Sequence, residues 1–178
     1  MIDFQNDQGL GKYLSACHSP AVAFLILLGI LLIGCSLKSH PADHVMEEKF
    51  QSNREDFNRL AMMLGEDSDI DRLSQKSVTL EENSKRSLTE ERLRDYRGLF
   101  VKLGLTGGMY RDRGDAIRLI ASPKHTLLMD SEKSYVYSAT PPSPVVQSLD
   151  KVIGSDRGDQ LPIYKQIADN WYLYYESW

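Results

Sequence analysis

The chain has 178 residues, of which 42% are hydrophobic and 26% are charged, and its formal net charge is −4. Removing Asp3, Asp7 and Lys12 with the first 34 residues changes that charge only to −3, and no basic stripe remains that would bind nucleic acid. The two cysteines are Cys17 and Cys35, so a domain that begins after Cys35 holds neither a disulfide nor a thiolate metal site. The remaining length suits one domain with its own core.

The first element along the chain is an uncharged apolar stretch at residues 21–33. Its 13 residues fit the core of a signal peptide, about 7–15 residues, better than a transmembrane helix, which needs about 20. The stretch runs into Leu32-Ile33-Gly34-Cys35, which resembles the lipobox of bacterial lipoproteins. The resemblance implies that a diacylglycerol is attached to the Cys35 sulfur and that the chain is cleaved between Gly34 and Cys35. Residues 1–34 would then be a signal peptide.

A lipid on Cys35 implies where the protein works. Two or more acyl chains, such as palmitate, make a stable anchor, so membrane lipid is an expected partner through Cys35 or the 21–37 segment. The domain would then face the periplasm or the exterior from a cell membrane. Ser36, rather than aspartate, follows the cysteine, and the sorting rule of Gram-negative lipoproteins then implies the outer membrane.

The segment before the apolar stretch departs from the signal-peptide pattern. Residues 1–20 are long for a positive leader region, and they contain Asp3 and Asp7 against a single basic residue, Lys12. Two explanations stay open: the true start lies downstream of residue 1, or residues 1–34 are a membrane anchor that is never cut. In both cases the rest of the chain works beside a membrane and outside the cytoplasm.

The part after the cleavage site divides into a tether and a domain. Residues 35–44 would be the lipidated cysteine and a polar tether, and residues 45–178 a single soluble domain. The domain opens with a predicted helix at 45–64, where apolar residues recur at spacings of three, four and seven. Gly65 ends this helix.

Two short strands are predicted next, at 70–73 and 77–80, and a second helix follows them. Ser87 and Glu90 have the spacing of a capping box, which marks the start of a helix. Gly104 suits the left-handed residue that closes one. The sequence therefore predicts a helix between these two signals.

The hydrophobic period changes to two in the second half of the chain. Three successive strands are predicted at 116–121, 126–129 and 134–138, with short polar connectors that are typical of an antiparallel meander. A third helix is predicted at 144–152, with Val145 on its inward face.

The chain closes with a predicted hairpin, 163–167 and 171–176, joined by a turn at 168–170. The predicted order is a helix, two short strands, a second helix and then mostly strands with one helix inserted. This order is typical of an α+β domain. We therefore expect an antiparallel sheet, made of the strand meander and the C-terminal hairpin. About three helices would pack on one face, and an apolar leader or anchor helix would precede them.

The C-terminal strand is rich in aromatic residues and offers a candidate partner-binding surface. In a strand, Tyr172 and Tyr174 face one way, Trp171 and Leu173 face the other, and Trp178 follows at the end. Because Trp and Tyr dominate binding hot spots, Tyr172, Tyr174 and Trp178 are the candidate contacts with a protein or a glycan. The alternative is that one face of this strand is core and the other packs under a helix or is half solvated.

The sequence contains no recognised motif for catalysis or metal binding. The acidic run at 66–71 has the start of a calcium loop, but Arg72 and Val78 replace the glycine and the glutamate that such a loop needs. It is better explained as an acidic turn. His125 is the single histidine within 45–178 and is typical of a surface residue. We therefore expect no metal site, no cofactor and no enzyme activity.

These observations favour a membrane-tethered cell-envelope lipoprotein whose small domain binds a protein or a wall component without catalysis. A specific version is a protector or inhibitor of a periplasmic toxin or hydrolase. The alternatives are an envelope-polymer hydrolase that uses dispersed carboxylates, a structural or assembly lipoprotein, and an uncut signal-anchored membrane protein. Residues 96–104 and 170–176 also resemble stretches of small exported bacterial proteins without assigned function, which implies no residue roles.

Overall fold

The computed structural model describes residues 39–81, 88–112, 116–126, 129–153 and 162–178. The chain divides into two units, residues 1–39 and 40–178, and the description below concerns the second unit. None of the helices among the described residues is long and apolar enough to cross a membrane. The predicted leader, with Gly34 and Cys35, lies outside the described residues.

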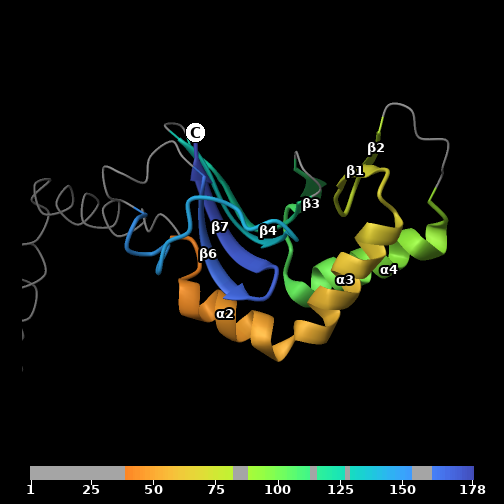
Figure 1. Cartoon of the computed structure of the whole chain (residues 1–178). Coiled ribbons are helices and arrows are strands. Elements are labelled where there is room, and N and C mark those ends of the chain that lie inside the picture. Colours follow the sequence, from red (N-terminus) through yellow and green to blue (C-terminus); the bar gives the residue numbers. More distant parts are fainter. Residues whose placement is uncertain (1–38, 82–87, 113–115, 127–128, 154–161) are drawn as a thin grey trace, which may run out of the picture. The chain divides into compact units, whose positions relative to one another are not determined.

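Seven described strands form one sheet in the order β2-β1-β3-β4-β5-β7-β6 (Figure 1). Every pair of neighbouring strands runs antiparallel. The strands are β1 (Ile70–Leu73), β2 (Val78–Leu80), β3 (Gly108–Arg111), β4 (Ile117–His125), β5 (Asp130–Tyr137), β6 (Ile163–Ala168) and β7 (Trp171–Ser177).

The described helices are α2 (Asp43–Ser52), α3 (Arg54–Glu66) and α4 (Glu90–Leu103), and Figure 1 shows them along one side of the sheet. Their apolar side chains form one core with the facing residues of the strands. The predicted α+β class, with an antiparallel sheet and three helices on one face, is therefore confirmed.

The core is built around aromatic rings from both layers. Phe50 of α2 and Phe57 of α3 lie 5.2 and 5.6 Å from the ring of Trp171 on β7, measured between ring centroids. Tyr135 of β5 lies 4.6 Å from Phe57. All four side chains are buried, so their apolar area is a main source of the folding free energy.

The predicted helix at 45–64 is two helices, because the helix breaks at Asn53. The Asn53 backbone leaves the helical region, with φ −130° and ψ 25°, and its N–H donates to the Phe50 carbonyl. Its side-chain amide donates to the Lys49 carbonyl at 2.9 Å. Asparagine competes for helix hydrogen bonds in this way. The helical spacing of apolar residues continues from Phe50 to Phe57 across the break, so this spacing alone does not reveal the break at Asn53.

α4 is capped at both ends. The Thr89 hydroxyl accepts a hydrogen bond from the Arg92 N–H at 3.2 Å, and Gly104 closes the helix with φ 64°. The predicted role of Gly104 is confirmed. The N-cap is Thr89 rather than the predicted Ser87, which lies outside the described residues.

β3 has no counterpart among the predicted strands. It starts at Gly108, whose φ is 79°, and a Cβ atom there would lie 2.2 Å from the Leu73 carbonyl oxygen of β1. Glycine is therefore required for β3 to pair with β1.

The predicted meander of three strands is one long hairpin, β4 and β5. β4 continues through the segment we expected to be a connector, with a bulge between Ile120 and Ser122. Thr126 and Met129, which we placed in a middle strand, instead close the connection, where the Thr126 N–H donates to the Met129 carbonyl. The two residues between them lie outside the described residues.

The predicted helix at 144–152 is wrong, because tertiary partners take its backbone groups. The Val146 N–H donates to the Tyr164 carbonyl at 2.7 Å, and the Leu149 N–H donates to the Asp43 carboxylate at 2.8 Å. Val145, expected on the inward face, is half exposed and forms a bridge with Tyr164. This segment therefore lines the edge of β6 instead of forming a helix.

The predicted C-terminal hairpin is confirmed as β6 and β7. Asn170 lies in its turn with φ 61°, a left-handed conformation that asparagine adopts more readily than most residues.

Candidate functional site

His40 is bound to the face of the sheet that the helices cover, just ahead of α2. Its Nδ1 lies 3.0 Å from the Ser122 hydroxyl of β4, and its Nε2 lies 2.9 Å from the Ser131 hydroxyl of β5. The ring meets the Tyr175 ring edge-on at 5.6 Å. Burial, followed by the positive charge of Lys124, lowers the pKa of His40 to about 4. The imidazole is therefore neutral at pH 7 and belongs to the fold.

A buried lysine on β5 holds the same part of the chain. Lys133 is 0% exposed, and its Nζ donates to the Pro41 carbonyl at 2.8 Å. The Nζ also lies 2.8 Å from Asp43 Oδ1 and 2.7 Å from Asp150 Oδ1. A buried ammonium group needs paired charges and hydrogen bonds, and here two carboxylates and a carbonyl provide them.

Asp43 connects the start of α2 to two further segments. Its Oδ2 accepts hydrogen bonds from the Leu149 N–H at 2.8 Å and the Ser148 hydroxyl at 3.1 Å. It also lies 3.4 Å from Lys165 Nζ of β6. Burial by itself would raise the pKa of Asp43, but the hydrogen bond and charge of Lys133 outweigh it and lower the pKa to about 2.

Asp150 takes the place of a local N-cap for α2. Ala42 makes no side-chain cap, and the Asp43 N–H instead donates to Asp150 Oδ2 at 2.7 Å. The residues from His40 to Asp43 are therefore bound to β4, β5, β6 and the 148–150 loop, although we predicted 35–44 as a tether. No spacing in the sequence indicates this cluster, because its charged members come from segments far apart in the chain.

The opposite face of the sheet carries a row of alternating arginine and tyrosine side chains. The Arg72 guanidinium lies 5.6 Å from the centroid of the Tyr110 ring, and the Arg118 guanidinium lies 4.6 Å from it. Arg118 also lies 3.7 Å from the Tyr174 centroid, and Tyr174 packs against Tyr164 at 5.2 Å. Cation–π and ring contacts thus connect β1, β3, β4, β7 and β6 on this face.

Three carboxylates on this face lie around the guanidinium of Arg118. It pairs with Asp112, and its Nη1 lies 3.5 Å from Glu176 Oε2 and 3.9 Å from Glu132 Oε1. Burial raises the pKa of Glu132, although the Ser134 hydroxyl donates to it at 2.6 Å. Because three carboxylates surround the buried guanidinium, its positive charge is balanced within the sheet.

Two large apolar side chains are exposed at the end of the sheet where β4 connects to β5. Trp178 is 60% exposed and Met129 is 42% exposed. Trp178 exchanges both backbone hydrogen bonds with Asp130, each at 2.9 Å. His125 Nδ1 lies 3.1 Å from Asp130 Oδ2, and Lys124 precedes it on β4. We call Lys124, His125, Met129 and Trp178 the hairpin end.

The predicted contact residues differ in their access to a partner. Tyr172 and Tyr174 are 3% and 0% exposed and pack with Val136 in a small cluster. The strand is therefore structural, as the alternative has it, but Tyr174 is covered by Arg118 and Tyr164 rather than by a helix or by solvent. Trp178 is the member of the predicted set that a partner could reach. Gly34 and Cys35 lie outside the described residues.

The acidic run after α3 binds other side chains. Asp67 Oδ2 accepts hydrogen bonds from Arg92 Nε and the Tyr96 hydroxyl, both at 2.7 Å, and so connects α3 to α4. In the part of the chain that the structure describes, no group of three or more His, Cys, Asp or Glu side chains could hold a metal ion.

A hollow of about 440 Å³ lies beside α2. Its lining includes His44, Glu47 and Glu48, with Ile167 from β6. The Glu47 carboxylate forms an ion pair with Lys165. Of the two glutamates that line the hollow, Glu47 is therefore held by Lys165.

No protein-family model, curated protein or solved structure matches this chain.

Proposed function

We propose that this protein is a cell-envelope lipoprotein that is tethered through Cys35 and whose domain binds a protein or a wall component without catalysis. The observation that carries the proposal is the position at which the folded unit begins. That unit starts at His40, and the residues from His40 to Asp43 are bound to the sheet. Four residues therefore separate Cys35 from the fold.

This short connection keeps the domain close to its anchor. Five residue steps span at most about 18 Å when fully extended, so a lipid on Cys35 holds His40 within that distance of the bilayer surface. A domain fixed so near the membrane meets other envelope components rather than reaching across the periplasm. In its specific form, the proposal places the protein at the outer membrane of a Gram-negative cell. There it would protect against, or inhibit, a periplasmic toxin or hydrolase.

The buried charges support a binding role over a catalytic one. The ion pairs of Lys133 with Asp43 and of Arg118 with Asp112 and Glu132 join elements of the fold to one another. Groups held in this way are paired with one another and are poorly placed to exchange protons with a substrate.

The lipid anchor is tested by growing cells with labelled palmitate and comparing two cysteine variants. We expect the wild-type protein and the Cys17→Ser variant to take up label and to sediment with membranes. The Cys35→Ser variant should take up none and should accumulate as precursor or become soluble. A Cys35→Ser variant that stays in the membrane at the wild-type length would favour the uncut anchor instead.

The binding role is tested by chemical cross-linking in intact envelopes, followed by purification of the anchored protein. We expect one partner at near-stoichiometric yield, and a much lower yield from the Cys35→Ser variant. Release of soluble fragments from purified wall polymer by the protein would contradict a non-catalytic role and favour the hydrolase.

A further inference from the structure

The hairpin end lies next to the point at which the chain enters the fold. His40 binds the Ser131 hydroxyl, and Ser131 pairs with Ser177 across β5 and β7. The next pair along the same strands is Asp130 and Trp178. Since a strand advances about 3.4 Å per residue, the Trp178 backbone lies one step beyond the Ser131–Ser177 pair.

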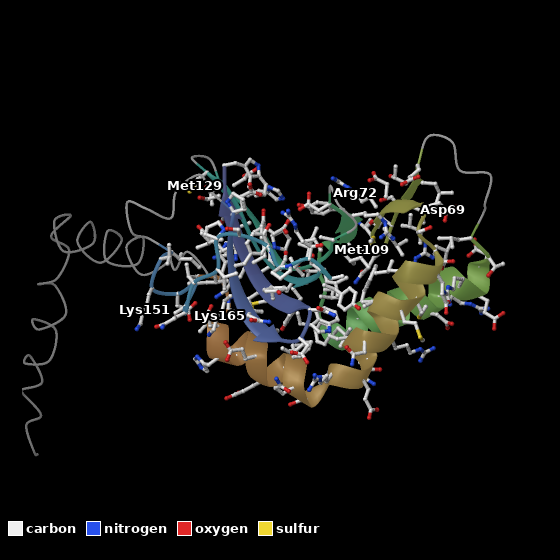
Figure 2. All side chains as sticks on the ribbon, in the orientation of Figure 1. Asp69, Arg72, Met109, Met129, Lys151 and Lys165 are labelled. Carbon is white, nitrogen blue, oxygen red and sulfur yellow. The ribbon has the colours of Figure 1, made fainter. Side chains whose placement is uncertain are left out.

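Met129 extends the same end of the sheet by one more residue. Figure 2 labels Met129 at this end, and Figure 1 marks the chain's C-terminus there as well. Among the residues that the structure describes, the other large exposed hydrophobic side chains include Val45 on α2, Met62 on α3 and Val101 on α4. The hairpin end therefore combines exposed apolar groups with proximity to His40.

We propose that the hairpin end contacts the lipid surface that holds the anchor on Cys35. Trp178 would lie at the level of the headgroups, with Met129 at the boundary of the acyl chains. This inference rests on the proposed function, since the tether defines which surface is within reach. The span of about 18 Å from His40 to the lipid lets anchor and hairpin end meet one bilayer face.

The chemistry of the hairpin end suits this occupant. Tryptophan places an apolar ring and a polar N–H at the membrane interface, and it is enriched there. The stem of Lys124 can lie along apolar surface while its ammonium group reaches the headgroups. Two apolar side chains alone bind a bilayer weakly, so the contact depends on the high local concentration that the tether provides. Trp178 thus faces lipid, and a protein partner binds another surface.

Tryptophan quenching in vesicles tests the contact. The acylated protein extracted from membranes is reconstituted in phosphatidylcholine vesicles whose acyl chains are brominated near the headgroup, and its emission is compared with that in unbrominated vesicles. We expect the Trp178 emission to fall by half or more. Trp171, which is 2% exposed and packed in the core, provides the reference in the Trp178→Phe variant, whose emission should not change.

A second variant controls for the mere presence of an exposed tryptophan. Val101 is 67% exposed on α4, and the double variant Val101→Trp, Trp178→Phe should show no quenching by brominated lipid. Equal quenching of the two positions, or a Trp178 that stays open to aqueous acrylamide in vesicles, would overturn the contact while leaving the anchor intact. Failure of the wild-type protein to float with the vesicles would overturn the anchor and the contact together.

Discussion

The ammonium group of Lys133 lies in the interior of the protein, with Asp43 2.8 Å away and also buried. Removing one partner of such a pair leaves the other charge unpaired in a poorly hydrated site. The cost falls on the segments that the pair joins, which are β5 and the start of α2. Replacing Lys133 therefore tests directly how the chain from His40 to Asp43 is held.

We expect the Lys133→Met variant to lose about 3–5 kcal/mol of its free energy of unfolding, because Asp43 then remains buried without its main partner. Urea denaturation measures this change. Lys151 is exposed, and the Lys151→Met variant should change the free energy by less than about 0.5 kcal/mol. Equal losses in the two variants would mean that the buried pair contributes nothing specific.

The imidazole of His40 predicts a dependence on pH. Its pKa is lowered from 6.5 to about 4, chiefly by burial, so the folded state binds fewer protons than the unfolded state between these values. The contribution of neutral His40 is complete above pH 6.5 and is lost as the pH falls to 4. We expect the free energy of unfolding to fall over this window in the wild-type protein and to fall less in His40→Gln. Parallel pH profiles of the two proteins would contradict this.

Alanine substitutions at two glycines should change the free energy of unfolding in opposite directions. Gly108→Ala should cost roughly 2–3 kcal/mol, because φ is 79° and the new Cβ would lie 2.2 Å from the Leu73 oxygen. Gly98 lies in α4 with nothing within 4 Å of a new Cβ, so Gly98→Ala should add about 0.5–1 kcal/mol. Thermal unfolding of both variants tests the pairing of β3 with β1. A stabilising Gly108→Ala would contradict that pairing.

Elements with a strong local signal could be predicted from the sequence. Alternation and turn residues predicted β6 and β7, and Gly104 predicted the end of α4. The helix expected at 144–152 fails because distant partners, the Tyr164 carbonyl and the Asp43 carboxylate, take its N–H groups.

The clusters of charged residues could not be predicted in the same way. Lys133, Asp43 and Asp150 meet only after the sheet register and the path of the 148–150 loop are set. Arg118 and Tyr174 likewise meet across β5, next to the small side chain of Ser134. Their contacts depend on tertiary structure, which no local spacing encodes. Trp178, which follows the last strand, is exposed, whereas the burial of Tyr172 and Tyr174 depends on how their face of the sheet is covered.

At the scale of the whole molecule, the two faces of the sheet serve different purposes. One face holds the aromatic core, the helices and the bound residues from His40 to Asp43. The other holds the Arg118 row, which connects the strands of the sheet through charge and ring contacts. Side chains on both faces of the sheet thus make contacts within the fold. The hairpin end is the part that the tether would bring to the membrane.

Mass spectrometry of the N-terminal peptide of the protein extracted from membranes tests the tether most directly. We expect a chain that begins at Cys35 and carries a diacylglyceryl group on the cysteine sulfur, with the first 34 residues absent. A peptide in which residues before Cys35 are still joined to an unmodified Cys35 would contradict the lipid anchor.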